Sequence, residues 1–464
     1  MTRRHRGGAP LAAITALIVA LSAAIYFAVA LDDGTRRRTG DGGRSYGSAV
    51  PASSGVWVGT WSASPVAAEP GTEVSGLAGR SVRNVVHTSV GGTSARVTLS
   101  NLFGRAPLSL THASVALADG AGAAAESGTM RRLTFGGRTT VVVPPGAQVV
   151  SDPVVLRVPY DGDVLVTTYS PTASGPVTHH PRARQISYGA AGDRTEDLTG
   201  AAFTEQVDAW RYLTALDVLT DEADGTVVVL GDSLTDGSSS SVGENRRWTD
   251  VLARRLRQAA EDGRDAPRYG VVNQGISGNR VLADGFVGGV TSPVGESLPR
   301  GRAGGRVERF AVDNPSGLKR FERDALGRAN VRVVVMDLGV NDILRDPRLA
   351  DPDRILDGLR AMADQAHGHG IKIVGATLMP FKGHPGYTDA REEVRQRINA
   401  GIRDGRVFDA VADFDRALRD PYDPRRLASD YDCGDHLHPS DRGYARMAAA
   451  LDLADLAGAV PARL

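Results

Sequence analysis

Two patterns of apolar residues divide the chain. From Val56 to about Asp221 the apolar residues come in short β-branched runs, and clusters such as the PPG at 144–146 separate them. The clearest runs lie at 94–100, 139–143, 153–158 and 163–169. Short runs divided by turn residues are typical of antiparallel sheets. We therefore predict an all-β domain here, a sandwich of jelly-roll type.

From about Gly225 onward, apolar strands alternate with helical segments. The predicted strands lie at 226–230, 269–275, 331–339, 371–378 and 408–414. The predicted helices lie at 247–262, 317–326, 354–370, around 394–402 and at 441–456. Strands that are apolar throughout are buried on both faces, which indicates a parallel sheet between two layers of helices. In such sheets, binding sites form at the carboxyl ends of the strands.

The first 31 residues predict an export signal. Arg3, Arg4 and Arg6 precede a run without charge at 11–31. As a helix this run is about 30 Å long, which is enough to span a bilayer and favours a membrane anchor. The sequence AVA at 28–30 fits a signal-peptidase site, so a cleaved signal peptide stays open as the alternative. In both cases the bulk of the protein would be extracytoplasmic, either secreted or anchored to the membrane.

The chain thus separates into four predicted segments. A length of 464 residues exceeds the ~100–200 of a single domain. Residues 32–55 are rich in Gly, Ser and Arg and predict a flexible linker. We expect a leader (1–31), this linker (32–55), a β-sandwich domain (56–221) and a catalytic α/β domain (222–464).

Charge and cysteine content exclude several classes of protein. The chain has 54 Lys and Arg against 54 Asp and Glu, so no overall field would attract nucleic acid. We expect no nucleic-acid partner, and membrane contact only through an uncleaved N-terminal segment. The single cysteine, Cys433, excludes an intramolecular disulfide and a Cys-rich metal cluster.

The candidate chemistry begins at the end of the first strand of the α/β domain, with the sequence GDSLTDG at 231–237. It lacks the lysine and the spacing of a phosphate-binding loop, and it lacks the G-x-S-x-G of the α/β-hydrolase elbow. What remains is Ser233, held on a tight turn at the active edge of the sheet. A serine nucleophile needs a base, and a third group must orient that base.

His438 is the strongest candidate for the base among ten histidines. Asp435, three residues earlier on the same loop, can fold back and accept a hydrogen bond from its Nδ1–H. His436 and Asp432 compete for the two roles, and His384 is a weaker candidate. The alternative is that Asp435 and His438 only precede and cap the last helix.

Two further sequences could supply donors to an oxyanion. NQGISGN at 273–279 follows the second strand, and its Gly275 would let a backbone N–H approach the substrate. GVND at 339–342 ends the third strand and places the amide of Asn341 at the same edge. Either sequence could also be a plain β-turn.

Together the four blocks GDSLTDG, NQGISGN, GVNDI and DHLHP resemble the SGNH (GDSL-type) hydrolase family. The upstream stretches at 57–65, 96–104 and 133–147 are similar to the β-rich N-terminal half of an extracellular bacterial subgroup. The resemblance implies a three-layer α/β/α domain with Ser233 as nucleophile, His438 as base and Asp435 as its orienting carboxylate. It further implies an oxyanion hole made of the Ser233 and Gly275 N–H groups and the Asn341 side chain, with Asp232 and Asp342 bracing the loops.

The resemblance implies hydrolysis of carboxylic esters through an acyl-enzyme, with no metal or cofactor. We expect a small-molecule or polysaccharide ester as substrate, with an acetyl-type acyl group and the β domain assisting binding. A lipase-like acylhydrolase and a non-catalytic cell-surface binding protein are the alternatives. The Gly/Arg-rich stretch at 283–313 departs from the family pattern and could cover the site. Cys433 is interpreted as a loop residue, because no cationic neighbour would obviously lower its pKa.

Overall fold

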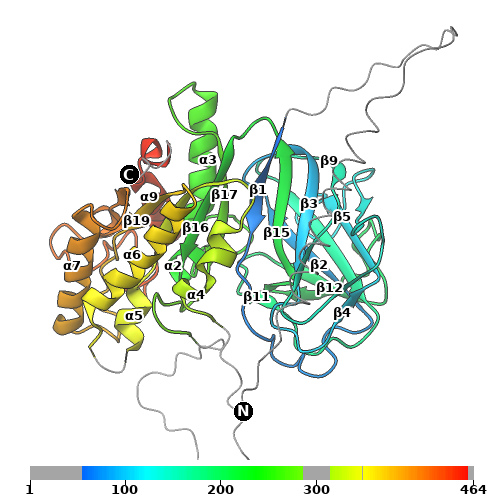
Figure 1. The fold of residues 1–464 in the computed structure, drawn as a ribbon, viewed down its shortest axis with the longest axis horizontal. Coiled ribbons are helices and arrows are strands. Elements are labelled where there is room, and N and C mark those ends of the chain that lie inside the picture. Colours follow the sequence, from blue (N-terminus) through cyan, green and yellow to red (C-terminus); the bar gives the residue numbers. More distant parts are fainter. Residues whose placement is uncertain (1–54, 286–313, 347–348, 458–464) are drawn as a thin grey trace, which may run out of the picture. The chain divides into compact units, whose positions relative to one another are not determined.

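Figure 1 shows the fold over the residues that this computed structural model describes, which are 55–285, 314–346 and 349–457. The predicted leader, nearly all of the predicted linker and most of the 283–313 stretch lie outside the described residues. Within the described ranges, no helix combines the length and the apolar character that a bilayer crossing requires.

The N-terminal part of the chain forms two antiparallel sheets that face each other. One has the order β1-β15-β3-β8, with β9 also paired to β3, and the other has the order β13-β12-β2-β10-β5-β6. Val58, Val97, Val82 and Val166 from the two sheets share one buried core, as in a β-sandwich. The strands of the first sheet are β1 (Val56–Ser62), β15 (Leu213–Thr220), β3 (Gly92–Ser100), β8 (Gln148–Val150) and β9 (Val154–Val158). Those of the second are β13 (Glu205–Val207), β12 (Ser187–Ala191), β2 (Arg80–His87), β10 (Asp163–Ser170), β5 (His112–Leu117) and β6 (Arg131–Arg132). Two small pairs complete the sandwich, β11 (His179–Pro181) with β14 (Ala209–Arg211) and β4 (Leu108–Leu110) with β7 (Val141–Val143).

The C-terminal part of the chain contains a parallel sheet of five strands. Its order is β17-β16-β18-β19-β20, so the chain switches direction across the sheet between β16 and β18. Open α/β sheets bind ligands at such a switch point, beyond the carboxyl ends of the strands. The strands are β16 (Gly225–Gly231), β17 (Tyr269–Gly275), β18 (Val331–Asp337), β19 (Lys372–Ala376) and β20 (Ala410–Ala412).

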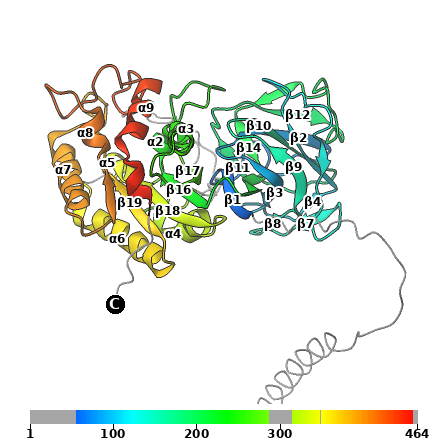
Figure 2. The same cartoon turned by 90° about the horizontal axis from the view of Figure 1, so that it is seen from above.

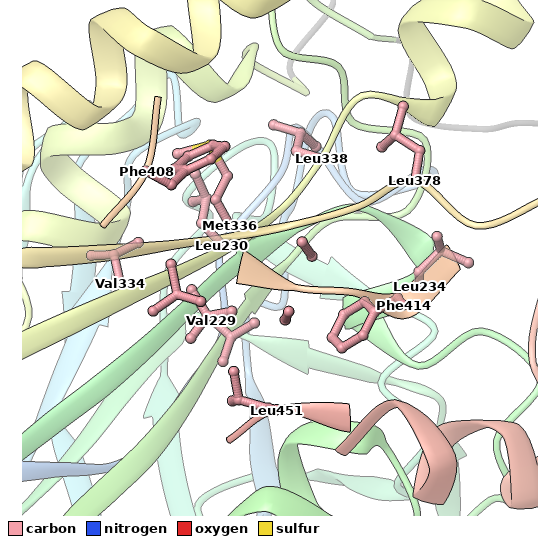
Figure 3. Close-up of a cluster of buried hydrophobic side chains, with 14 of the residues drawn as sticks. Val229, Leu230, Leu234, Val334, Met336, Leu338, Leu378, Phe408, Phe414 and Leu451 are labelled. Atoms are coloured by element: carbon pink, nitrogen blue, oxygen red, sulfur yellow. The ribbon is translucent and has the colours of Figure 1, made fainter. Parts of the chain in front are cut away.

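Helices cover both faces of this sheet. Figure 2 shows α3 (Trp248–Glu261) and α9 (Asp441–Ala450) on one face, and α4 (Gly317–Phe321) and α6 (Pro352–Gly368) on the other. Figure 3 shows apolar side chains of the strands, such as Val229 and Met336, packed with Phe408, Phe414 and Leu451 from the flanking segments. The remaining helices are α2 (Ser233–Asp236), α5 (Val340–Arg345), α7 (Asp389–Arg403) and α8 (Phe414–Leu418). The predicted fold class, a three-layer α/β/α domain preceded by an all-β sandwich, is confirmed.

Three predicted elements differ in extent from the observed ones. The last strand, predicted at 408–414, is limited to β20, because Asp413 already caps α8 by accepting from the Arg416 N–H. The helix predicted at 317–326 becomes a π-helical turn after Phe321. The helix predicted at 441–456 ends at Ala450, and Asp452 caps a separate 3₁₀ turn.

Strand β1 of the sandwich lies against β17, the edge strand of the parallel sheet, so that Ser54–Leu464 form one compact unit. The Gly59 N–H donates to Thr226 Oγ1 at 2.9 Å, and the Val271 N–H of β17 donates to Ser89 Oγ at 2.9 Å. A Cβ on Gly270 would lie 2.3 Å from the Gly59 carbonyl oxygen, so the two backbones approach as closely as glycine allows. This contact protects an edge that would otherwise offer unpaired backbone groups. The boundary at 221/222 between two domains stays a prediction.

Two carboxyl groups are buried next to each other at the ends of the neighbouring strands β16 and β18. Asp232 follows β16 and Asp337 ends β18, and both are about 1% exposed. Burial raises the pKa of Asp337 to about 7, although a hydrogen bond from Thr235 Oγ1 opposes the shift. Burial and the neighbouring Asp337 also raise the pKa of Asp232. The pair is therefore not fully ionised below neutral pH.

The pH dependence of stability tests this burial. Between about pH 4 and pH 7 the unfolded chain ionises Asp337 and the folded protein does not, so wild-type stability should fall as pH rises, by up to roughly 4 kcal/mol. We expect Asp337→Asn to remove most of this decline. Urea unfolding from pH 4 to 7 measures it, and equal slopes for wild type and variant would contradict the raised pKa.

Candidate active site

Ser233 is the first residue of α2, the single helical turn that follows β16. The side chain of Asp232 caps this turn by accepting from the Leu234 N–H at 3.0 Å. Gly237 ends it in the left-handed region, at φ 90°, where its N–H donates to the Ser233 carbonyl at 3.1 Å. A strand that turns this tightly leaves the Ser233 hydroxyl at the carboxyl edge of the sheet.

Three side chains form a hydrogen-bonded chain there. His438 Nε2 lies 2.9 Å from Ser233 Oγ, and His438 Nδ1 lies 2.6 Å from Asp435 Oδ2. Because Asp435 is an acceptor, the Nδ1 carries the proton and the Nε2 accepts from the serine. The second oxygen of Asp435 accepts from the backbone N–H groups of Leu437 (2.9 Å) and His438 (2.8 Å). The loop therefore fixes the carboxylate that orients the imidazole, which is the arrangement that a serine nucleophile needs.

Asp435 is held in its ionised form. Partial burial would raise its pKa, but the hydrogen bonds and charge of His438, together with the Leu437 N–H, lower it well below the ordinary value. A permanent negative charge beside His438 stabilises the imidazolium that forms when the ring takes a proton from serine.

The competing residues on the same loop form a separate pair. His436 Nδ1 lies 2.6 Å from Asp432 Oδ2, and half of the His436 side chain is exposed. His384 accepts from the Gly386 N–H instead. The capping alternative does not hold either, because the cap of α9 is Ser440, whose hydroxyl accepts from the Gly443 N–H at 3.3 Å.

Gly275 does not serve as the oxyanion donor that we expected. Its N–H donates to Asn273 Oδ1 at 2.8 Å and so already has an acceptor. Glycine is needed there for packing, since a Cβ would lie 2.3 Å from the Asp236 nitrogen of α2. The prediction for Gly275 is therefore corrected.

The second glycine of the same block takes a more suitable position. Gly278 is buried in the left-handed region, at φ 79°, and its N–H has no acceptor among the described residues. The same holds for the Ser233 N–H within the described ranges. Both donors are therefore available to a ligand. The block NQGISGN contains both glycines, but the sequence does not reveal which of the two N–H groups already donates to an acceptor within the protein.

Asn341, at the start of α5, presents its amide at the same edge. Its Nδ2 donates to Asp232 Oδ2 at 3.2 Å, which leaves the second amide hydrogen free for another acceptor. Its Oδ1 accepts from Arg345 Nε at 3.1 Å, so the arginine fixes which way the amide faces. A Cβ on Gly278 would lie 2.9 Å from the Arg345 guanidinium, which places the Asn341 and Gly278 loops next to each other.

Asp342 and Asp232 each accept hydrogen bonds that link neighbouring loops. Asp342 accepts from the N–H groups of Val281 (2.7 Å) and Leu282 (3.1 Å), directly after the NQGISGN block. Burial raises the pKa of Asp342 to about 6. Asp232 links α2 to Asn341 by the two bonds given above. Neither carboxyl group contacts the Ser233 hydroxyl in any hydrogen bond of the described chain.

A buried arginine that the sequence analysis did not single out ties the strand ends together. Arg320 of α4 is fully buried, and its guanidinium donates to the carbonyls of Gly231 (2.9 Å) and Gln274 (2.7 Å). Its Nε donates to Asn279 Oδ1 at 3.0 Å. Burial lowers its pKa to about 10, so it stays charged at neutral pH. Arg320 thereby fixes the ends of β16 and β17 relative to each other.

One group within the described part of the chain brings potential metal ligands together, namely Asp432, Cys433 and Asp435. Both carboxylates already bond to histidines, and burial raises the pKa of the Cys433 thiol. These three residues are therefore a poor fit to a metal site.

The chain was compared with known families and structures. Residues 229–446 match the sequence model of the GDSL-like Lipase/Acylhydrolase family, and no protein of curated function matches. A member of the lipolytic protein G-D-S-L family from Veillonella parvula is 17% identical, covering 48% of this chain and 94% of its own, at a TM-score of 0.32. A family two carbohydrate esterase from Clostridium thermocellum, solved with cellohexaose, is 13% identical over 85% of this chain and 92% of its own, at a TM-score of 0.34. At these values the structural similarities carry no argument about function.

The family match spans Ser233, Asn341, Asp435 and His438. Three of the four blocks lie at or just after the carboxyl end of a strand, and DHLHP lies on the loop between α8 and α9. Residues 229–446 of this chain are a GDSL-like lipase/acylhydrolase domain, and the chain is a carboxylic ester hydrolase.

Proposed function

We propose that the protein hydrolyses esters through a covalent acyl-enzyme on Ser233. The observation that carries the proposal is the single imidazole of His438, which lies within hydrogen-bond distance of both Ser233 Oγ and the Asp435 carboxylate. Ser233 attacks the ester carbonyl while His438 takes its proton. His438 then gives this proton to the departing alkoxide, and a water molecule that His438 deprotonates releases the acid.

The proposed oxyanion hole combines three donors. They are the N–H groups of Ser233 and Gly278, which have no acceptor in the described chain, and the free amide hydrogen of Asn341. Removing one donor of this kind typically costs 10²–10³ in kcat. Arg345 supports the third donor, because its bond to Asn341 Oδ1 keeps the Nδ2 directed toward the site.

We propose a small acyl group, of the acetyl type, on a hydrophilic alcohol such as a carbohydrate. The hydrogen-bonded side chains on the loops next to Ser233 are polar, namely Asn341, Arg345, Asp232 and Ser277. The exposed large apolar side chains among the described residues are scattered, and none belongs to the four blocks. A lipase that works at a lipid surface would instead need a contiguous apolar patch.

We also propose that the protein works outside the cytoplasm. The support is the charge-free run at 11–31 after three arginines, which lies outside the described residues. The mass of the protein in the medium and in the membrane fraction would separate a cleaved leader from an anchor.

A fluorophosphonate probe tests the nucleophile. We expect stoichiometric labelling of wild type at Ser233, because the probe reacts with a serine that a base activates. Ser233→Ala should lose labelling and esterase activity. Ser239→Ala is the matched control, because its exposed hydroxyl lies six residues away and donates to the Pro439 carbonyl. Full labelling of Ser233→Ala would contradict the assignment.

The two histidines of the loop give a second test. His438→Ala should lower kcat by a factor on the order of 10⁴ or more. His436→Ala should change kcat only a few-fold, because His436 pairs with Asp432 and not with Ser233. Steady-state kinetics with p-nitrophenyl acetate measures both, and the reverse order of effects would assign the base to His436.

A substrate series tests the acyl group and the alcohol. We expect the highest kcat/KM with p-nitrophenyl acetate among p-nitrophenyl esters, and release of acetate from an acetylated polysaccharide. Preference for the p-nitrophenyl ester of a long-chain acid would favour the lipase-like alternative. No hydrolysis of any ester by the folded protein would favour a binding protein.

A further inference from the structure

A histidine of the sandwich reaches the active-site loops. His180 lies in β11 and is about 4% exposed. Its Nδ1 lies 2.8 Å from the Ser64 carbonyl oxygen and its Nε2 lies 2.9 Å from Asp236 Oδ1. A carbonyl and a carboxylate both accept hydrogen bonds, so each ring nitrogen of His180 faces an acceptor, one in the sandwich and the other in α2.

Asp236 links this histidine to the NQGISGN loop. It is the last residue of α2, three positions after Ser233. Its second oxygen accepts from Ser277, at 3.0 Å from the backbone N–H and 2.6 Å from the hydroxyl. Burial would raise the pKa of Asp236, but the charge and hydrogen bond of His180, the hydrogen bond from Ser277 and the charge of Arg247 lower it overall. The group that holds Ser277 is thus an anion, and its histidine partner comes from the sandwich.

The next residue after Ser277 is Gly278, whose N–H is free to bind a ligand. Asp236 holds both the nitrogen and the hydroxyl of Ser277. The Ser277 carbonyl, which shares a peptide with the Gly278 N–H, accepts from Asn314 Nδ2 at 3.3 Å, so the direction of this N–H is restricted. We propose that His180 is a positioning residue for ester hydrolysis: through Asp236 and Ser277 it holds the Gly278 N–H in the oxyanion hole. The inference rests on the proposed function and extends it to a residue of the other sheet system.

The His180–Asp236 pair is not needed to hold the sandwich and the parallel sheet together. A buried ion pair contributes little net stability compared with apolar packing of the same volume. The two sheet systems are already joined by the Gly59–Thr226 bond and by Arg320, which donates to Ser64 Oγ at 3.0 Å. The charge of Arg247 also acts on Asp236, and its Nε donates to the backbone carbonyl of Asp236 at 3.0 Å. Loss of His180 would leave the buried Asp236 carboxylate without this partner, which costs stability, and should loosen the Ser277–Gly278 peptide.

Kinetics of full-length His180→Ala with p-nitrophenyl acetate test the proposal. We expect kcat to fall roughly 10–100-fold with KM changed less than about 2-fold, because a misplaced donor affects the transition state more than substrate binding. His180→Gln, which can still donate to Asp236, should recover most of kcat. The matched control is His179→Ala, in the same strand and equally buried, whose Nδ1 has no partner in the described chain. This control should keep wild-type kcat.

A double-mutant cycle tests whether His180 acts through Asp236. We expect Asp236→Asn to lower kcat to a similar extent, and the double variant His180→Ala/Asp236→Asn to be no worse than the poorer single variant. Multiplied effects would overturn the proposal, as would an unchanged kcat in a His180→Ala protein with a wild-type Tm. If His180→Ala fails to fold, the kcat of His180→Gln is the deciding measurement. A fall in its kcat as large as that of Asp236→Asn overturns the proposal.

The same proteins separate this inference from the proposed function. If Ser233 is not the nucleophile, the fluorophosphonate probe does not label Ser233 in the wild type, and Ser233→Ala reacts as the wild type does. If only the role of His180 is wrong, wild type and His180→Ala react with the probe at equal rates.

Discussion

The carbonyl groups at the ends of β16 and β17 are buried, and the guanidinium of Arg320 satisfies both of them. A buried carbonyl without a donor costs free energy comparable to a lost hydrogen bond, so these strand ends need a partner that reaches both at once. Arginine suits this role because its donors lie in one rigid plane. Ser233 follows one of the two strands and the NQGISGN block ends the other. The Gly231 carbonyl also accepts from the Ile276 N–H at 3.1 Å. The separation between the nucleophile and the proposed oxyanion donors therefore depends on this bond together with one buried cation, which Asp324 of the following turn balances at 3.4 Å.

The sandwich adds partners to the same strand ends. Ser64, just after β1, donates to the Gln274 side chain and accepts from Arg320, and its carbonyl accepts from His180. Polar groups of this kind would be left without partners if the sandwich were a separable attachment, and unpaired buried groups are rare in folded proteins. The edge strand β17 has a comparable need, because its Val271 N–H donates to Ser89 of the sandwich. The β-rich part of the chain thus supplies hydrogen-bond partners that buried polar groups of the parallel sheet require.

The sequence is informative wherever local spacing determines the geometry. Periodicity placed the strands and helices, because burial on one or both faces dictates the spacing of apolar residues. Asp435 and His438 could be paired in advance because three residues on one loop suffice to close the bond. The choice between Gly275 and Gly278 could not be made, since it depends on whether the Asn273 side chain folds back onto its own strand. The contacts of His180 join segments that are distant in the sequence, so the spacing of apolar residues does not predict them. Arg320 lies within a predicted helix, where a charged residue normally indicates a solvated face.

The carboxyl groups at the active edge have opposite electrostatic roles. Asp435 accepts from His438 and from two backbone N–H groups, and these interactions keep it charged beside the imidazole. Asp232 and Asp337 are buried within the sheet end, and burial raises the pKa of each. Asp232 bonds to Asn341, so a full negative charge there would oppose the oxyanion that Asn341 is proposed to stabilise. Neighbouring carboxyl groups can have different roles in one site because their environments give them different pKa values. The negative charge is therefore concentrated next to the base, where it assists proton transfer, and is reduced next to the oxyanion donors, where it would slow the reaction.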